Sequence, residues 1–489
     1  MTSPLQPRPS TARQRWDKDV PTLLRPLVRA YILGYATTVT PRLITLVLRQ
    51  YVTTKKARKA RGSSGADSSG PSSSQQPALS TPLLHILRGG LELQRFPTFC
   101  ALLVGGSSLL EFPLSAIISR LASRLKPLAR QRLARFLSAF CAAWYSLKLL
   151  QSKHSDAFTE RATVQSDDAQ PHRLVEDLTL FALTRALDVI VGELWDRRHR
   201  TKRRPWAQLD TAISKLTDPS IFALSCGFIM WSWFYYPSRL PRAYSQWIST
   251  AAAVDARLIE ALRRCRKGEI RYGEDTGQAP LLEAMARDYG WPVEWGDPAK
   301  TAPYPCEMVH MGCGPSCEYH FISRFARSFK WSMTTYLPLN LLLVARSPRL
   351  KAFKKALVSA SRSSAFLAAF ITLFFYGVCL ARTRVGPHLI GKDAASRTKI
   401  DAGICVGTGC FLCGWSILLE AAGRRKDIAL FVAPRAMATL LPRRYHLDKQ
   451  WRETLVFSLS TAVVFTCVLE NQTRVRGVLG KVLATVLVP

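Results

Sequence analysis

The sequence predicts an all-α, multi-pass membrane protein of two tandem four-helix repeats joined by a cysteine-rich hinge. Three observations support this fold class. Apolar residues make up 48% of the 489 residues although the formal charge is +34, so basic residues must be segregated from long apolar runs. Landmarks in the first apolar half recur in the same order in the second half. Between the halves lies the densest group of cysteine and histidine in the chain, from Cys306 to Cys317.

The pattern of positive charge favours a membrane rather than a nucleic acid as the partner of this chain. A nucleic-acid binder carries basic residues interleaved with exposed aromatic residues on a folded face. Here the basic runs 55–61, 197–204 and 424–426 adjoin apolar segments, as loop charges beside membrane spans do. We therefore expect the lipid bilayer, and no nucleic acid, as a partner.

Residues 1–81 are expected to precede the first repeat. A disordered arm is followed by an apolar stretch, 21–52, which several arginines interrupt. This pattern favours a helix that lies in the membrane interface or packs on other helices. Residues 62–77 are rich in Ser, Gly, Pro and Gln, which is typical of a linker that packs no core.

The first helical membrane repeat is expected over residues 82–249, an extramembrane insert with the hinge over 250–325, and the second repeat over 326–489. The apolar segments of the first repeat are Phe96–Ile118, Phe136–Leu150, Leu178–Trp195 and Ile221–Tyr236. Those of the second are Trp331–Ala345, Ala365–Ala381, Ala402–Ala422, Ile428–Leu441 and Leu455–Leu469. A full span needs roughly twenty residues, so the shorter segments are tilted, partly buried in protein or not fully spanning.

Four short matches in the same order indicate that the two repeats arose by duplication. They pair Thr37–Pro41 with Thr334–Pro338, Phe140–Trp144 with Phe411–Trp415, Asp177–Ala186 with Asp427–Ala436, and Phe222–Ser225 with Phe457–Ser460. The third pair includes an arginine inside an apolar helix. Internal symmetry of this kind is used by membrane proteins that build a shared site between their halves. Plain structural duplication is the alternative interpretation.

The hinge offers four metal-ligating side chains in one segment, Cys306, His310, Cys313 and Cys317. Four cysteine or histidine ligands are what a tetrahedral zinc site requires, so zinc is a candidate cofactor. The spacing is not that of a standard zinc finger. A closed site would need a tight turn, which Gly312, Gly314 and Pro315 permit. The alternatives are a disulfide, or cysteines that only pack.

Two arginines at equivalent repeat positions, Arg185 and Arg435, lie inside apolar segments. A guanidinium in a membrane helix costs roughly 2.5–3.5 kcal/mol on insertion scales, so each needs a partner or a wet cavity. The candidate partners are Glu111 or Asp188 for Arg185, and Glu420 for Arg435. Such arginines also suit a polar path for anionic head groups or acyl carboxylates. The alternative is that each side chain extends to the interface.

Small residues inside two apolar segments indicate close helix packing. These are Gly105 and Gly106 in the first repeat, and Gly403 and Gly407 in the second. Glycine lets membrane helices approach closely where no hydrophobic effect drives their association. The chain carries no Gly-x-Ser-x-Gly, Walker or His-Glu-x-x-His motif, so no catalytic residue is predicted.

Motifs in fixed order from 305 to 445 resemble those of a known family. They are Cys306, His310 and Pro315-Ser316-Cys317; Lys330 with Tyr336-Leu-Pro338-Leu; Gly414-Trp-Ser-Ile-Leu-Leu-Glu420 with Arg424-Arg425; and Leu430-Phe-Val-Ala-Pro434-Arg435-Ala436. On these motifs the chain resembles the transmembrane protein 135 family, also called peroxisomal membrane protein 52. That family is further similar to the four-helix mitochondrial translocase and peroxisomal membrane protein superfamily.

The resemblance implies a multi-pass protein in the membrane of an intracellular organelle, above all a peroxisome or mitochondrion. It implies a link to lipid and fatty-acid handling and to organelle dynamics, without an enzymatic reaction. The expected partners are then lipids or acyl anions and other organelle membrane proteins. The alternative function is a protein-import or membrane-assembly component, and a third is a membrane enzyme that uses the cysteine–histidine hinge.

Overall fold

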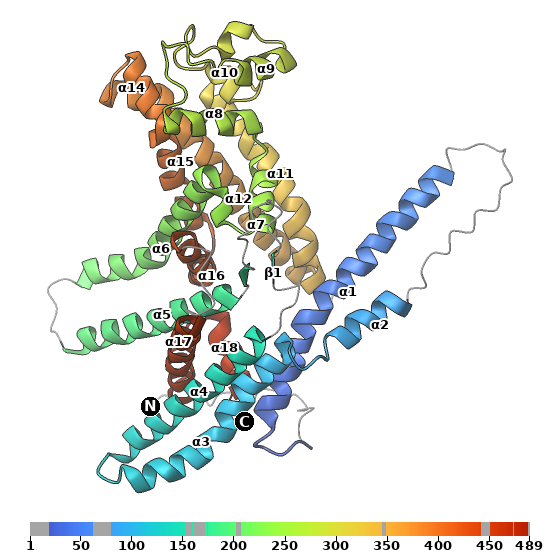
Figure 1. The fold of residues 1–489 in the computed structure, drawn as a ribbon, viewed down its shortest axis with the longest axis vertical. Helices are drawn as coiled ribbons and strands as arrows, with labels where there is room; N and C mark the ends of the chain where they lie inside the picture. Colours follow the sequence, from blue (N-terminus) through green and yellow to red (C-terminus); the bar gives the residue numbers. More distant parts are fainter. Residues whose placement is uncertain are drawn as a thin grey trace, which may run out of the picture. The chain divides into compact units, whose positions relative to one another are not determined.

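The computed structural model describes residues 19–61, 80–152, 159–160, 172–173, 175–201, 207–344, 349–441, 450–472 and 474–487. These residues are almost entirely helical (Figure 1). The two strands among them, β1 (Thr159–Glu160) and β2 (His172–Arg173), form one short antiparallel pair. The predicted all-α fold class is therefore confirmed.

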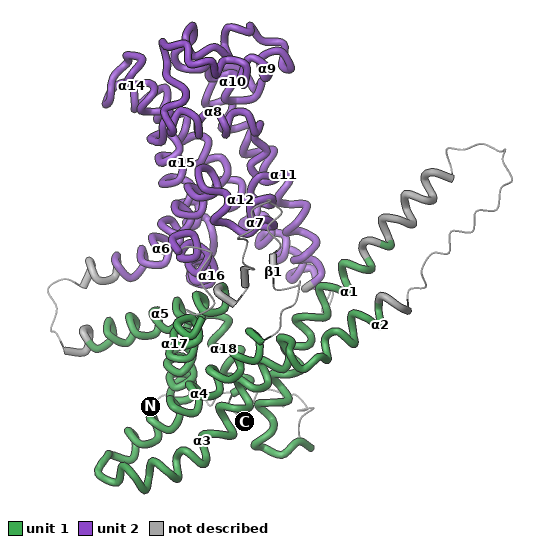
Figure 2. The backbone as a smooth tube through the Cα atoms, viewed as in Figure 1, with its two compact units in different colours: residues 1–201, 445–489 green, residues 202–444 purple. Residues whose placement is uncertain are grey.

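The chain forms two compact units, coloured separately in Figure 2. Unit 1 contains residues 1–201 and 445–489, and unit 2 contains residues 202–444. These units do not divide the chain at the predicted repeat boundaries. The last helix of the predicted first repeat, α6 (Ala207–Tyr235), belongs to unit 2, and α17 (Gln450–Glu470) of the predicted second repeat belongs to unit 1.

Five helical stretches among the described residues are long and apolar enough to cross a membrane. Unit 1 contains three of them, Phe96–Leu121, Pro127–Gln151 and Gln450–Glu470, and unit 2 contains Leu350–Arg384 and Ala394–Leu419. A helix needs roughly twenty apolar residues to cross the hydrocarbon layer. Their length and composition define an integral membrane protein.

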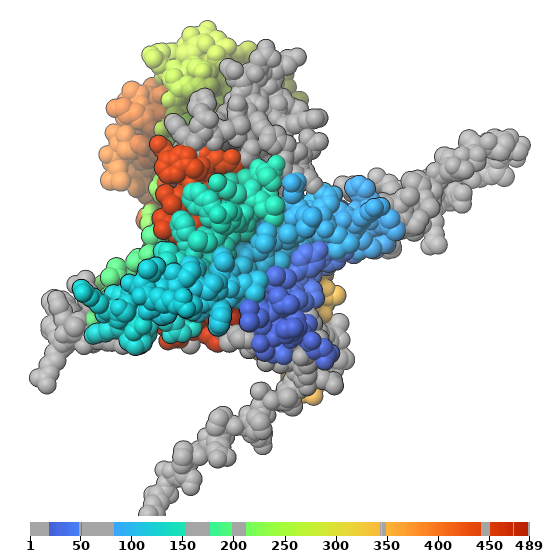
Figure 3. Space-filling view, turned by 60° about the horizontal axis from the view of Figure 1, so that its bottom comes forward, coloured from blue at the N-terminus to red at the C-terminus, as the bar shows by residue number. Residues whose placement is uncertain are grey.

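Unit 1 is a series of helices packed side by side. Its helices are α1 (Arg25–Arg61), α2 (Ser80–Gly89), α3 (Phe96–Leu121), α4 (Pro127–Gln151), α5 (Val175–Thr201), α17 and α18 (Gly477–Leu487). The packing order is α1, α3, α4, α17, α5, and α18 lies on both α17 and α1. Figure 3 shows α3 and α4 side by side on one face of this unit, with α1 against α3. The stretch 21–52 thus forms a helix packed on other helices.

Glycines of α3 let its neighbours approach closely. A Cβ added to Gly105 would lie 2.5 Å from the side chain of Leu27 in α1, and one on Gly106 would lie 3.3 Å from Ala142 in α4. On other sides α3 exposes large apolar side chains, namely Leu102, Leu109, Phe112, Ile117 and Leu121. These side chains are suited to contact with lipid, since no water-soluble surface would carry so many.

Unit 2 repeats this kind of packing with other helices. Its long helices are α6, α11 (Cys317–Val344), α12 (Leu350–Cys379), α15 (Cys405–Cys413) and α16 (Ala422–Leu440). The packing order is α11, α12, α15, α6, α16. Beside them lie the short elements η1 (Pro237–Arg239), η3 (Leu380–Arg384), α13 (Gly386–Leu389), α14 (Ala394–Lys399), η4 (Ile400–Ile404) and η5 (Gly414–Leu419).

The predicted helix Ala402–Ala422 is broken in the structure into η4, α15 and η5. Gly403 has non-helical backbone angles with φ +155°, and a Cβ there would lie 2.7 Å from an Nη1 atom of Arg266. Gly403 is therefore a break point that only glycine suits, rather than a position inside a smooth helix. Gly407 makes an ordinary contact, since its added Cβ would lie 3.7 Å from the ring of Trp231.

The insert between α6 and α11 is a small folded cap with its own core. It contains α7 (Arg242–Ala252), α8 (Ala256–Lys267), α9 (Pro280–Tyr289), η2 (Val293–Gly296) and α10 (Cys306–Val309). Ile270, Leu282, Met285 and Met308 are fully buried in this core. Asp255 caps α8 by accepting a hydrogen bond from the Arg257 N–H, and Gly268 and Gly290 end α8 and α9 in the left-handed conformation.

Candidate metal centre and apolar cavities

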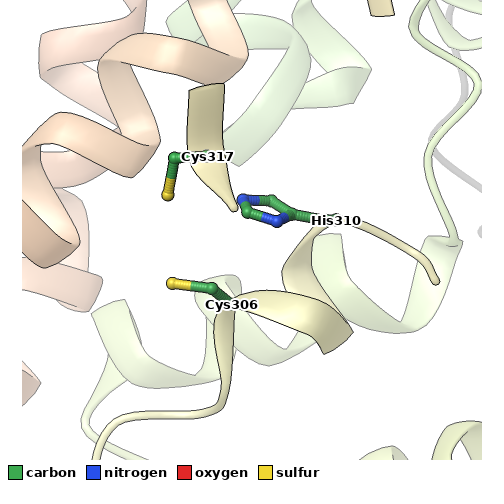
Figure 4. Close-up of side chains that lie close together, drawn as sticks. All are labelled: Cys306, His310 and Cys317. Carbon is green, nitrogen blue, oxygen red and sulfur yellow. The ribbon is translucent and has the colours of Figure 1, made fainter. Parts of the chain in front are cut away.

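Three of the four predicted hinge ligands converge at the junction of α10 and α11 (Figure 4). Cys306 is the first residue of α10, His310 follows its last residue, and Cys317 is the first residue of α11. Their ligand atoms all lie within 4.8 Å of one another. Ligands around a tetrahedral zinc ion lie about 3.8 Å apart, given metal–ligand bonds of about 2.0–2.3 Å, so small side-chain movements would close this group on an ion.

The turn between His310 and Cys317 brings these side chains together. Met311, Gly312 and Gly314 have φ values of +53°, +77° and +88°, so the backbone reverses in the left-handed region. Glycine occupies that region without the steric penalty of a Cβ. The His310 N–H donates to the Cys306 carbonyl at 2.7 Å, which closes the α10 turn.

A backbone hydrogen bond sets the tautomer of His310. Its Nδ1 lies 2.8 Å from the Gly314 carbonyl, which can only accept, so Nδ1 carries the proton and Nε2 presents its lone pair. Burial lowers the pKa of His310 and raises the pKa of the Cys306 thiol. The histidine is therefore neutral, as a ligand must be, and a bound cation would favour loss of the thiol proton.

The sulfur atom of Cys379, at the end of α12, lies beside this group. Cys379 Sγ is 3.2 Å from His310 Nε2. Cys379 follows His310 by 69 residues and lies in an apolar run. No local spacing marked it as a ligand, and its sequence context indicated only a small buried side chain.

Cys313 is not part of this group, which corrects the predicted ligand set. It lies inside the left-handed turn, and its sulfur is 3.9 Å from Nη2 of Arg327. The turn that brings His310 and Cys317 together directs Cys313 elsewhere. All twelve cysteines lie in described segments and are free thiols, so the structure contains no disulfide at the hinge.

A buried ion pair beside the metal group links the cap to the membrane helices. Arg382 donates to both carboxylate oxygens of Asp401, at 2.7 and 2.8 Å, and the two side chains are 4% and 1% exposed. Tyr272 of the cap donates to the same carboxylate at 2.5 Å, and Arg382 also donates to the Tyr304 carbonyl. No periodic pattern in the sequence predicted this network, because its members lie far apart along the chain.

The carboxylates predicted to pair with Arg185 form ion pairs with other arginines. Glu111 accepts from Arg135 at 2.9 Å, and Asp188 pairs with Arg476. Arg185 itself is 5% exposed, and its guanidinium lies 5.2 Å from the ring centre of Phe181.

Arg435 and Glu420 do not form the predicted pair. Glu420 is 2% exposed and accepts from Ser363 at 2.9 Å, while its cationic partner is Arg424 at 3.5 Å. Arg435 is half-buried on the ring of Phe431, at 4.1 Å from its centre, and donates to the Phe431 carbonyl. Glu420 lies just before α16, whereas Arg435 lies about 20 Å further along this helix at about 1.5 Å per residue.

Unit 1 contains a partly open cavity of about 310 Å³ with an almost entirely apolar lining. Helices α1, α3, α5, α17 and α18 line it. The lining residues are Leu178, Phe181, Ala182 and Arg185 on α5; Phe457, Thr461, Val464 and Phe465 on α17; and Leu479, Val482, Leu483 and Val486 on α18. These positions recur every three or four residues, so each helix presents a single face to the cavity.

Unit 2 contains a second, partly open cavity of about 260 Å³, lined by α6, α7, α11, α12 and α16. The α16 contribution is Ile428, Phe431 and Val432; that of α6 is Phe222, Cys226, Ile229 and Met230; and that of α7 includes Tyr244, Trp247, Ile248 and Ala251. The lining residues of α6 have the same sequence spacing as those of α17 in unit 1. The four named residues of α7 likewise have the same spacing as those of α18 in unit 1.

The fold and the site together define a helical integral membrane protein with a cysteine–histidine group that is able to bind a metal ion. Comparisons with the known protein families, with curated proteins and with solved structures find no match.

Proposed function

We propose that this chain is a non-enzymatic, multi-pass membrane protein of an intracellular organelle, such as a peroxisome or mitochondrion, that binds the apolar chains of lipids. The observation that carries this proposal is the pair of apolar cavities, one inside each unit. Helices long and apolar enough to cross a membrane contribute to both linings, namely α3 and α17 in unit 1 and α12 in unit 2. Ligand cavities in proteins are usually concave, largely apolar and preformed, with volumes of about 300–1,000 Å³. The unit 1 cavity is at the lower end of this range and the unit 2 cavity is just below it.

Equivalent lining positions support two tandem repeats whose last helices are exchanged. In the segment matches predicted from the sequence, α5 corresponds to α16 and α17 corresponds to α6. In each unit these helices line the cavity. Phe222 matches Phe457, and Phe181 matches Phe431, and all four side chains line a cavity. The exchange assigns α6 to unit 2 and α17 to unit 1, as the compact units do. Internal repeats that each carry part of a binding function are common in membrane transporters.

The resemblance to the transmembrane protein 135 family is consistent with this proposal, because it implies lipid or fatty-acid handling in peroxisomes or mitochondria. The candidate partners are then the bilayer, lipids or acyl anions, and other membrane proteins of the same organelle. The alternative, a protein-import or membrane-assembly component, derives from the likeness of that family to the translocase superfamily.

Zinc is the cofactor that best suits the hinge. The structure brings together Cys306, His310 and Cys317, and Cys379 as a fourth ligand would make this a Cys₃His set. Zinc in closed sites of this composition stabilises folded structure rather than performing catalysis. The ion would join α10 and α11 of the cap region to the end of α12. Metal analysis of freshly purified, reduced protein tests this, and we expect about one zinc per chain.

Deletion of the protein, followed by two measurements on the isolated organelle, separates the two functions. Lipid binding predicts an altered content of acyl lipids in that organelle, while a precursor protein added to it is imported at the normal rate. A normal lipid profile with slowed import would instead support the alternative. A variant that fills both cavities, Ala182→Trp with Val432→Trp, should reproduce the lipid effect of the deletion.

A further inference from the structure

Two thiols of the metal group are placed to react with each other. Cys306 Sγ and Cys317 Sγ lie within 4.8 Å, and Figure 4 shows both sulfur atoms turned toward the same space at the junction of α10 and α11. Cys306 is half-buried, whereas Cys317 is 7% exposed. An oxidant from solution therefore reaches Cys306 first, and a second thiol lies next to the sulfur that it attacks.

We propose that this metal group is redox-sensitive: oxidation joins Cys306 to Cys317 in a disulfide and releases the bound ion. This inference rests on the zinc site of the proposed function. Zinc binds cysteine as the thiolate, and a disulfide retains no thiolate, so neither sulfur serves the ion after oxidation. Because the second thiol lies close by, oxidation should end at the disulfide, which other thiols reduce, rather than continue to sulfinic acid.

Hydrogen peroxide, a small two-electron oxidant, fits the half-buried position of Cys306. The Cys306 sulfur attacks one peroxide oxygen, the O–O bond breaks, and the other oxygen takes a proton and leaves as water. The sulfenic acid formed at Cys306 is then attacked by the Cys317 sulfur, which forms the S–S bond and displaces the remaining oxygen as a second water with another proton. Two thiolates thus lose two electrons, and one peroxide is reduced to two waters. The ion takes no part in the electron transfer, because zinc has no redox chemistry.

The pairing is specific because the other nearby thiols are placed differently. The Cys313 sulfur lies 3.9 Å from Nη2 of Arg327, so it is not part of the converging group. Cys379 belongs to α12, and its sulfur contacts His310. After oxidation of the other two thiols, His310 and Cys379 are fewer donors than a closed zinc site requires. Oxidation therefore links α10 to α11 and removes the metal bridge from both to α12.

Peroxide titration of the full chain tests the inference. The protein is purified in nanodiscs with zinc bound and reductant removed, and released zinc is measured with a chromogenic chelator. Cleavage after Glu307 and Glu318 places Cys306 and Cys317 in separate peptides, so mass spectrometry identifies the link. We expect about one zinc released for each disulfide formed, and zinc rebinding after treatment with dithiothreitol. Cys313→Ser is the matched control and should behave like the wild type.

The peptide map and the released metal decide the proposal separately. A main product that links Cys306 to Cys313 or Cys379 would overturn the pairing. Release of zinc with only sulfinic or sulfonic acids at these positions would overturn the disulfide, and full retention of zinc in a large excess of peroxide would overturn redox sensitivity. Reduced protein that neither contains nor takes up zinc would instead overturn the proposed cofactor and the release step, while the peptide map of the metal-free chain still tests the disulfide.

Discussion

The cavities of the two units share a steric frame but differ in where they place charge. Phenylalanines, and side chains of similar spacing on α17 and α6, line both cavities. In unit 1 the arginine of the matched segment reaches the lining, whereas in unit 2 it lies half-buried outside it. The lining residues of the two cavities thus have similar spacing, while the arginine of the matched segment belongs to the lining in unit 1 alone.

The units also differ in what is attached to them. Unit 2 carries the cap, the metal group and the buried Arg382–Asp401 pair, and the described part of unit 1 has no counterpart of these features. Changes to the cap should therefore act on unit 2 and leave the unit 1 cavity intact.

The largest effect is expected from Cys379→Ser. Loss of one of four ligands should reduce the zinc content from about one equivalent to near zero, because apparent binding energies of structural zinc reach about 10–16 kcal/mol with a complete ligand set. Cys313→Ser is the matched control, and it should retain the metal because its sulfur faces Arg327. Zinc measured by mass spectrometry checks both variants, and full retention of zinc in Cys379→Ser would show that Cys379 is not a ligand.

Asp401→Ala should be the next most damaging change. It leaves the guanidinium of Arg382 buried without its carboxylate, and breaking a buried pair in this way costs about 3–5 kcal/mol. The double variant Arg382→Leu with Asp401→Ala removes the stranded charge and should recover part of the stability. Thermal unfolding of the purified protein measures both. A single variant as stable as the wild type would mean that this pair does not hold the cap on η3 and η4.

Sequence patterns were sufficient for the helices but not for the partners of their polar groups. The apolar run after Phe96 predicted α3 almost to its ends, because high hydropathy extends along the helix. Helix α4 begins earlier than predicted, at Pro127, because arginines of its first turns reach carboxylates such as Glu111 and Glu470. The assignment of α6 to unit 2 and of α17 to unit 1 was not predicted, since sequence order carries no information about which unit a helix joins.

The metal group shows the same limit. The spacing of the hinge predicted Cys306, His310 and Cys317, which one turn brings together. Cys379 could not be predicted because it approaches from another helix, and Cys313 was included because the direction of a side chain in a left-handed turn is not visible in spacing. The ion pair of Glu420 was also not predicted: Glu420 pairs with Arg424, four residues further along the chain, rather than with Arg435.

Arg424→Leu should have a smaller effect than the changes above, and Arg435→Leu serves as its comparison. The first leaves Glu420 buried without its cation and should lower stability by about 1–3 kcal/mol, and Glu420→Gln should partly restore it. Arg435→Leu should change stability less, because Arg435 forms no ion pair within 4.0 Å among the described residues. Protein abundance and unfolding temperature check this ranking. The reverse order would favour the originally predicted pair.

The smallest effect is expected from Asp255→Ala in the cap. Loss of the cap of α8 should cost about 1 kcal/mol. Hydrogen bonds from the Arg257 side chain lower the pKa of Asp255. The unfolded carboxyl therefore binds a proton more readily, so this stabilisation is present above the ordinary aspartate pKa of about 3.9 and is lost as the pH falls through the lower folded value. The difference in unfolding temperature between wild type and variant, measured from pH 7 to pH 3, should shrink only in this acidic range.

The central claim is that each unit holds one acyl chain in an equivalent cavity, and native mass spectrometry of the full chain tests it most directly. Ala182 and Val432 occupy matched lining positions in the two units. After purification with added palmitate, we expect up to two bound acyl ligands in the wild type, one in either Ala182→Trp or Val432→Trp, and none in the double variant. The same number of bound ligands in all four folded proteins would contradict the claim.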